Sequence, residues 1–366
     1  MQLLKSKSFA TLGLVLVTFF CAGRSPNGDT LPSGNKSKSL QNFNNTSEQD
    51  GDKNADLEEA KRLFNRGEFE KAIAILDRLI VTKTLTKDLI QEASELLAVA
   101  LVSNNQDDRA KQVFVNLLKA DRNYRPNDQW WPHRRLINNY FRSMQEAGIS
   151  LQVEKPDPGI KTIAIMDFDN NSIDDAERLE NLGKALSKIL ITDMTVLSNL
   201  RVVERERLQF LLDELKVEQS QFFDKATTAK IGKVLGAHSF VFGSFIRIGK
   251  TFRIDARLVK TETGEIFKTA SVEGKPDKIF ELAKKLILKI VNNLDVTIKK
   301  IEEKQLDDLG GSNIPIEALA LWGEAIDRAN REKYKDAYKN LEQALALAPS
   351  FTKAREMMDV IRPLAL

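Results

Sequence analysis

Two aspartates at the end of a predicted strand are the residues best placed for chemistry in this 366-residue chain. Asp167 and Asp169 flank Phe168 directly after the apolar run that starts at Ile163. Carboxylates at a strand end can act as general acids or bases or can bind a divalent cation. They can also order the polar turn that follows the strand. The residue types alone leave these alternatives open.

The remaining reactive side chains exclude several kinds of site. The chain has two histidines, His133 and His238, and one cysteine, Cys21, so it cannot build a Cys/His zinc site or an intramolecular disulfide. A carboxylate-only magnesium or calcium site stays open, although no EF-hand spacing occurs. Phosphate-loop, nucleophile-elbow and HExxH motifs are absent from the sequence. We therefore expect no catalytic residue, cofactor or metal, and we expect His238 to be structural.

Charge is nearly balanced along the chain. The formal net charge is +3, and no block of basic residues stands out, which argues against nucleic-acid binding. Glu204, Arg205, Glu206 and Arg207 alternate in sign at the start of a predicted helix. We expect this run to form a local ion-pair network or a solvated face.

The N-terminus has the three parts of an export signal. Lys5 and Lys7 precede the apolar run Phe9–Phe20, and Cys21 follows at once. Residues 1–20 resemble a bacterial lipoprotein signal peptide, which implies a lipid on Cys21. An ordinary secretory signal, cut near Ala22 or Gly23 with Cys21 removed or left as a free thiol, is the alternative. Residues 21–55 are rich in polar residues and are expected to form a disordered tether.

Helical hairpins are predicted at both ends of the folded part, over residues 56–150 and 314–364. In each hairpin, two alanines twelve residues apart lie on two short helices joined by a polar turn. This spacing resembles the tetratricopeptide repeat, whose concave face often binds peptides. The three pairs are Ala60 with Ala72, Ala98 with Ala110, and Ala325 with Ala337. Trp130 and Trp131 are candidates for a partner-binding patch, and core packing between the helices and the next domain is the alternative.

Residues 160–298 change to a pattern of alternating strands and helices. The predicted order is β-α-β-α-α-β-β-β-α, which indicates an α/β fold with a mixed sheet and packed helices. Gly249-Lys250 is a two-residue hairpin turn, and Thr263-Gly264 starts a second turn, so the last three strands form an antiparallel meander. Gly236 is expected to cap the helix before this meander.

Four motifs of this segment resemble the periplasmic domain of the CsgG family of curli-secretion proteins. They are IAIMDF at Ile163–Phe168, VVER at Val202–Arg205, the segment Ile231–Ser244, and TGE at Thr263–Glu265. The resemblance implies a mixed α/β fold and a protein of the bacterial envelope. It also implies that Asp167 and Asp169 order a turn and do not catalyse a reaction.

The sequence departs from the curli exporter at two connections. The exporter inserts a transmembrane hairpin at each, whereas here only Gly249-Lys250 and Gly274-Lys275-Pro276 occupy these places. A transmembrane strand needs about 9–11 residues, so neither connection can hold one. We therefore expect that the chain does not make a pore by itself. It resembles the non-pore lipoprotein relatives of the family.

These observations together predict a non-enzymatic envelope lipoprotein. It would act as a scaffold or accessory subunit in outer-membrane or periplasmic assembly or secretion, and it would do so by binding envelope proteins. Its lipid would lie in the outer membrane, and its folded part would face the periplasm. One alternative is a regulator of an envelope enzyme such as a peptidoglycan synthase. Another is an oligomeric component of an export complex that recruits a separate pore, and a homo-oligomer stays open.

Overall fold

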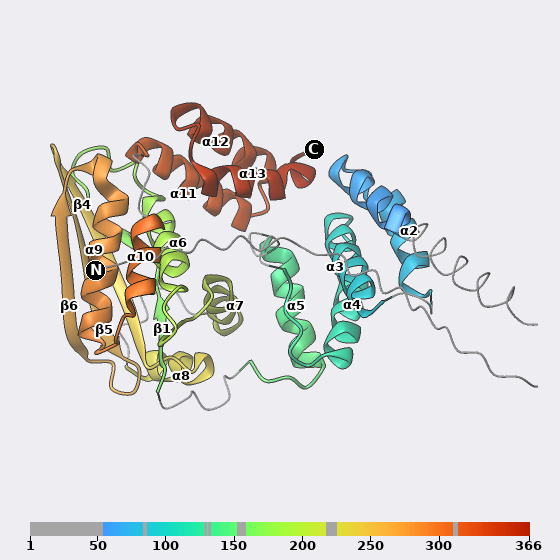
Figure 1. Cartoon of the computed structure of the whole chain (residues 1–366), viewed down its shortest axis with the longest axis horizontal. Helices are drawn as coiled ribbons and strands as arrows, with labels where there is room; N and C mark the ends of the chain where they lie inside the picture. Colours follow the sequence, from blue (N-terminus) through green and yellow to red (C-terminus); the bar gives the residue numbers. More distant parts are fainter. Residues whose placement is uncertain are drawn as a thin grey trace, which may run out of the picture. The chain divides into compact units, whose positions relative to one another are not determined.

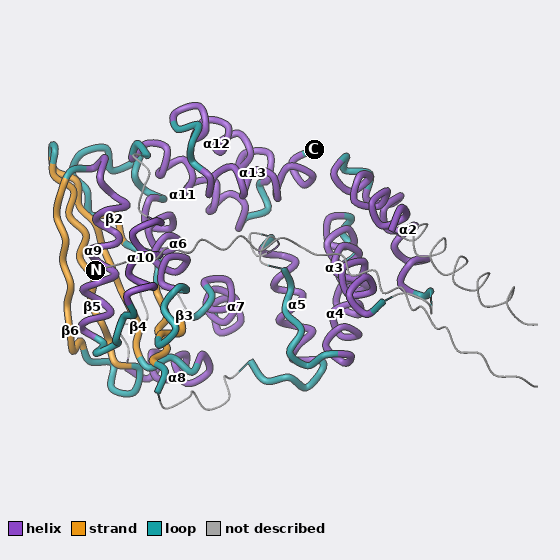
Figure 2. The backbone as a smooth tube through the Cα atoms, viewed as in Figure 1, coloured by secondary structure: helices purple, strands orange, loops and turns teal. Residues whose placement is uncertain are grey.

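The computed structural model describes residues 54–82, 86–127, 130, 133–151, 159–216, 225–309 and 314–366, all within one compact unit, Asp50–Leu366. Its architecture is mixed α/β, as the sequence predicted (Figures 1 and 2). Cys21 and Trp131 lie outside the described residues. Within the described part of the chain, no helix combines the length and the apolar character needed to cross a bilayer.

A mixed sheet forms the centre of the fold, with strand order β3-β1-β4-β5-β6 and β2 paired beside β4. Strand β1 runs parallel to β3 and to β4, and β4, β5 and β6 form the predicted antiparallel meander. The strands are β1 (Lys161–Ile165), β2 (Asp169–Asn170), β3 (Leu200–Val202), β4 (Ser239–Ile248), β5 (Thr251–Lys260) and β6 (Ile266–Gly274).

The connections between the strands are as short as the sequence indicates. Gly249 has a φ of 56°, and Gly249-Lys250 alone joins β4 to β5. After β6, only Lys275 precedes the short 3₁₀ helix η3 (Pro276–Lys278). Gly236 ends a helix with a φ of 62°, the left-handed conformation of a C-terminal cap. No inserted segment interrupts the meander, which is described over its whole length.

Strand β1 contributes to a hydrophobic core on each side of the sheet. Because neighbouring side chains of a strand point to opposite faces, Ile163 and Ile165 enter one core. Ala164, with Met166 directly after the strand, enters the other core. The first core contains α6 (Leu182–Met194) and α9 (Ile279–Asn293), and the second contains α7 (Arg205–Leu215) and α8 (Lys225–Leu235).

Helical hairpins extend both cores. The N-terminal helices join the core of α7 and α8, and the C-terminal helices join the core of α6 and α9. The six alanines of the predicted hairpins are all fully buried, so paired helices approach closely there. The resemblance to the tetratricopeptide repeat stays a prediction. Residues 54–65 are helical, followed by α2 (Phe69–Ile80), α3 (Lys87–Ser103), α4 (Asp107–Ala120), α5 (Arg134–Glu146), α10 (Lys300–Leu309), α11 (Ile316–Asn330), α12 (Tyr334–Leu347) and α13 (Thr352–Ala365).

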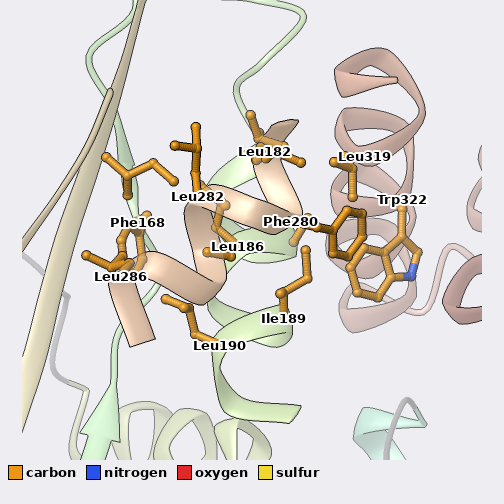
Figure 3. Close-up of a cluster of buried hydrophobic side chains, with 14 of the residues drawn as sticks. Phe168, Leu182, Leu186, Ile189, Leu190, Phe280, Leu282, Leu286, Leu319 and Trp322 are labelled. Carbon is orange, nitrogen blue, oxygen red and sulfur yellow. The ribbon is translucent and has the colours of Figure 1, made fainter. Parts of the chain in front are cut away.

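Helix α11 packs directly on α6. Leu319 of α11 lies near Leu182 and Leu186 of α6 in the cluster that also contains residues of α9 (Figure 3). A Cβ atom placed on Gly323 would lie 2.1 Å from the carbonyl oxygen of Asn181, just before α6. Lys184 of α6 also forms an ion pair of 2.6 Å with a carboxylate of α11. The two helices are therefore fixed together by backbone contact and by charge.

The alternating run before and within α7 forms an ion-pair network, one of the two expected alternatives, and not a solvated face. Arg205 is only 5% exposed and donates two hydrogen bonds, of 3.0 and 2.7 Å, to the carboxylate of Asp167. Glu206 pairs with Lys188 of α6 at 3.1 Å. An ion-pair network does form, but these partners are distant in the sequence. The run therefore ties α7 to the end of β1 and to α6.

The contact between α11 and α6 makes a prediction for Gly323→Ala. An added methyl group would meet the Asn181 backbone, which cannot rotate away, so we expect a loss of roughly 1–3 kcal/mol in the free energy of unfolding. Urea unfolding of the native protein and of Gly323→Ala measures this difference in free energy. In a helix without this contact the same change would stabilise by about 0.5–1 kcal/mol, so a gain in stability would contradict the packing.

The pairing of Asp167 with Arg205 makes a second prediction. Asp167→Asn leaves a buried guanidinium without its anion, so we expect a loss of roughly 3–5 kcal/mol in stability at pH 7. Burial acts to raise the pKa of Asp167, but Arg205 and Ser187 hold it below its ordinary value. The stability that the Asp167 carboxylate contributes is therefore fully present above about pH 4. It is lost as the pH falls through the lowered pKa of Asp167.

Urea unfolding at pH 7 and at pH 3 tests whether the stability loss of Asp167→Asn becomes smaller at low pH. Asp359→Asn is the matched control, because Asp359 is 57% exposed and pairs with Arg362 of the same helix. We expect the control to change stability by less than about 0.5 kcal/mol. A penalty for Asp167→Asn that is equally large at both pH values would refute the ionic account.

Candidate functional site

A groove lies between α6, the start of α7, α11 and α13, with a volume of about 590 Å³. Pockets of this size are typical of ligand-binding sites. We call it the α6–α13 groove. Its apolar floor consists of Ile191, Trp322, Ile326, Met357 and Val360. The charged residues that line it are Arg125, Lys188, Glu204, Arg205, Glu206, Lys353 and Glu356.

Helical periodicity brings these side chains to the groove. On α11, Trp322, Ile326 and Ala329 are spaced by four and three residues, so they lie on one face of the helix. On α13, Lys353, Met357 and Val360 repeat the same spacing. Trp322, Ile326, Ala329 and Met357 are also members of the buried core, so the groove opens directly onto that core. Helical periodicity therefore brings one side of α11 and one side of α13 together at the groove.

Trp322 carries a polar group that the fold leaves unsatisfied. The side chain is only 3% exposed and packs edge-on against Phe351, with ring centroids 5.3 Å apart. Its indole nitrogen is buried without a hydrogen-bond partner and lies on the side of the ring away from Leu182 and Leu186 (Figure 3). A buried indole N–H usually has a partner, and leaving one unmade costs about 1–3 kcal/mol. A residue that lines the groove therefore carries a hydrogen-bond donor without a partner.

Several of the charges at the groove are held in ion pairs, among them that of Lys188 with Glu206 at 3.1 Å. Burial acts to raise the pKa of Glu206, but Lys188 and Arg205 hold it below its ordinary value. Lys353 lies 3.5 Å from Asp193 of α6. Burial raises the pKa of Asp193, and this lysine offsets only part of the effect. Lys188, Glu206 and Lys353 are therefore held in place by charge contacts at the edge of the apolar floor.

The structure separates the two strand-end aspartates. Asp167 accepts hydrogen bonds from Arg205 and from Ser187, whereas Asp169 lies in β2, beside β4. Burial raises the pKa of Asp169. His238 accepts a hydrogen bond of 3.0 Å from the backbone N–H of Thr162, a structural contact between neighbouring strands. No group of three or more His, Cys, Asp and Glu side chains in the described ranges could hold a metal ion.

Trp130 lies among the N-terminal helices and does not line the groove. It is half-buried, stacks edge-on against Phe64 with ring centroids 5.8 Å apart, and hydrogen-bonds Glu95. These contacts are those of core packing. Its partner-binding role stays a prediction, as does that of Trp131.

The floor of the groove was missed at the level of sequence. Trp322 lies three residues before Ala325, inside the repeat that the alanine spacing revealed, so a signal for α11 was present. What the spacing does not show is that α6, more than 120 residues earlier, lies across from this face. Only the packing of α11 on α6 brings Ile191 opposite Trp322.

Comparison with known proteins adds a family resemblance over part of the chain. The family model for the curli production assembly/transport component CsgG matches residues 144–253, a little under a third of the chain. This range contains three of the four motifs noted above, and the fourth follows it. No curated protein sequence matches the chain significantly.

Solved structures similar to the chain include three from bacteria. They are the C-terminal domain of LpoB from Salmonella enterica (13% identity, TM-score 0.27, 41% of this chain and 99% of that one), the lipoprotein GNA1162 from Neisseria meningitidis (13%, 0.28, 38% and 99%), and a PelC dodecamer from Paraburkholderia phytofirmans (11%, 0.24, 40% and 96%). Over residues 144–253, the chain is thus similar to the CsgG family.

Proposed function

We propose that this chain is a non-enzymatic protein of the bacterial envelope that binds a segment of a partner protein in the α6–α13 groove. In this role it serves as a scaffold or accessory subunit of an assembly or secretion machine. The observation that carries the proposal is the apolar floor around the buried, unpartnered indole N–H of Trp322. The match to the CsgG family over residues 144–253 and the N-terminal pattern of an export signal support a place in the envelope.

The groove suits an apolar side chain next to a hydrogen-bond acceptor. An apolar residue of the partner would cover Ile191, Ile326 and Val360 and would gain about 25 cal/mol for each Å² that it buries. A carbonyl group next to it would accept the Trp322 N–H. Because the groove is formed by helices packed in one core, little ordering free energy is lost on binding.

The absence of an enzymatic role is part of this proposal. Three titratable groups that line the groove are held in ion pairs, since Lys188 pairs with Glu206 and Lys353 pairs with Asp193. Arg205 is likewise bound to Asp167. A general acid or base needs a group free to exchange a proton with a substrate. These pairings support a binding role.

The proposed anchor is a lipid on Cys21, with residues 21–55 as the tether to the folded part. Acyl chains contribute about 0.8 kcal/mol for each buried CH₂ group, and more than one chain is needed for stable anchoring. The tether would let the groove reach a partner at a distance from the membrane. The cysteine content agrees with a lipid anchor, since Cys21 is the single cysteine of the sequence.

Replacing an apolar floor residue by a charge tests the groove. Val360→Asp places a carboxylate on the half-buried floor, and we expect at least about a tenfold loss of co-purified partner from detergent-solubilised envelopes. Leu347→Asp is the matched control, since Leu347 is apolar, 51% exposed and on α12, outside the groove. Quantitative mass spectrometry measures the amount of each co-purified protein for both variants. Equal recovery of every partner from the two variants would exclude the groove as the binding site.

Replacing the cysteine tests the anchor. Cys21→Ser removes the proposed site of acylation, so we expect the chain to move from the membrane fraction to the soluble fraction of lysed cells. Intact-mass spectrometry of the native chain should show a diacyl or triacyl mass increase on the N-terminal peptide. Retention of Cys21→Ser in the membrane fraction, or an unmodified native N-terminus, would rule out the lipid anchor.

A further inference from the structure

A second cavity lies between the N-terminal helices and the sheet, with a volume of about 530 Å³. Side chains of α5, β1, β3 and α7 line it, together with the loop after α4. This cavity is distinct from the α6–α13 groove, although Arg125 and Glu204 line both. We call it the arginine pocket, after Arg122, Arg125, Arg201 and Arg207.

The arginine pocket carries a strong excess of positive charge. Glu204 is the single carboxylate among the described residues that line it, so the lining has four positive charges and one negative charge. Glu204 lies 3.6 Å from Arg125. Two other guanidinium groups donate to backbone carbonyls, Arg122 to Gly148 and Arg207 to Leu151. Carbonyl groups fix the orientation of a guanidinium but do not neutralise its charge.

Two polar groups that line the pocket lack a hydrogen-bond partner. They are the Nε of Arg207 and the hydroxyl of Thr162, and both atoms are buried. Thr162 is only 1% exposed. Each such group costs about 1–3 kcal/mol if it stays unpaired. A guanidinium N–H and a hydroxyl group can both donate to an oxygen of a bound anion.

The titration of the neighbouring tyrosine agrees with this charge distribution. Burial and Glu204 raise the pKa of Tyr140 to about 12, and the positive charges of Arg125 and Arg207 act against this rise. Burial lowers the pKa of Arg207, and Glu204 and Tyr140 offset only part of this effect. The positive charges of Arg125 and Arg207 therefore reach the side chain of Tyr140 inside the pocket. An anion bound there would be attracted by the same charges.

We propose that the arginine pocket binds a small oxyanion, the phosphate or carboxylate group of a soluble ligand. Guanidinium groups match these anions through paired N–H···O bonds. The anion would lie against Arg201 and Arg207 and would satisfy the Arg207 Nε and the Thr162 hydroxyl. The ring of Tyr140 offers an apolar wall to the remainder of the ligand. This site is proposed in addition to partner binding in the α6–α13 groove, with which it shares Arg125, Val202 and Glu204.

Isothermal titration calorimetry of the full chain in detergent tests the proposal, with pyrophosphate and citrate as the probes. We expect saturable one-to-one binding of at least one probe, weakened by added sodium chloride because the attraction is ionic. Binding of pyrophosphate alone would identify a phosphate ligand, and binding of citrate alone a carboxylate ligand. Saturable binding of neither probe at low salt would overturn the proposal.

Arg201→Gln is the first variant to test, because Arg201 is exposed and its loss should leave the fold intact. We expect binding to weaken by about tenfold to a hundredfold. Arg207→Gln should weaken it at least as much, and its thermal unfolding shows whether it folds. Arg66→Gln is the matched control, with the same charge change at an exposed turn outside the pocket. An equal loss in Arg201→Gln and Arg66→Gln would show non-specific attraction and would also overturn the proposal.

Discussion

Helix α6 is the element on which the rest of the structure depends, because it is buried against two layers at once. One side packs in the sheet core with α9, and the other receives α11. Both approaches need glycine, since a Cβ atom on Gly183 would lie 1.7 Å from the carbonyl oxygen of Phe168, and one on Gly323 would lie 2.1 Å from that of Asn181. The end of β1, the start of α6 and the middle of α11 thus form a continuous backbone contact.

This arrangement gives the α6–α13 groove fixed walls. The ion pairs of Lys184 with Asp327 and of Lys353 with Asp193 add charge contacts from α6 to α11 and α13. The buried pair of Arg205 with Asp167 holds the start of α7 at the end of β1. Since each wall is packed into the same core, the groove is preformed, which favours binding because less conformational entropy is lost.

The two sets of helical hairpins contact each other directly as well as through the sheet. His133, before α5, lies 3.1 Å from the hydroxyl of Tyr334 on α12, and Arg135 pairs with Glu332 at 3.7 Å. Burial, the largest effect, and the charge of Arg135 lower the pKa of His133 to about 4, so this imidazole is neutral near pH 7. Arg125 and Glu204 lie where the groove and the arginine pocket adjoin. The loop after α4 therefore contributes to both cavities through Arg125.

Local patterns in the sequence were sufficient to predict the helices and strands. They were not sufficient to predict which residues of different elements contact one another. The meander followed from alternation and from Gly249-Lys250, and the hairpins followed from the spacing of alanines such as Ala325 and Ala337. The charges of residues 204–207 were expected to be local or solvated because sequence neighbours are the obvious partners. Their actual partners include Asp167 and Lys188, which reach them only through the parallel pairing of β1 with β3 and the packing of α6. The floor of the groove escaped prediction for the same reason.

Site-specific photo-crosslinking in intact cells tests the central claim most directly. A photoreactive amino acid would replace Ile191 or Val360 in the groove, and Leu347 on the exposed face of α12 as the control. The account predicts that both groove positions yield the same crosslinked envelope protein and that the control position does not. Products that are identical at all three positions, or absent from both groove positions while the chain is folded and exported, would contradict it.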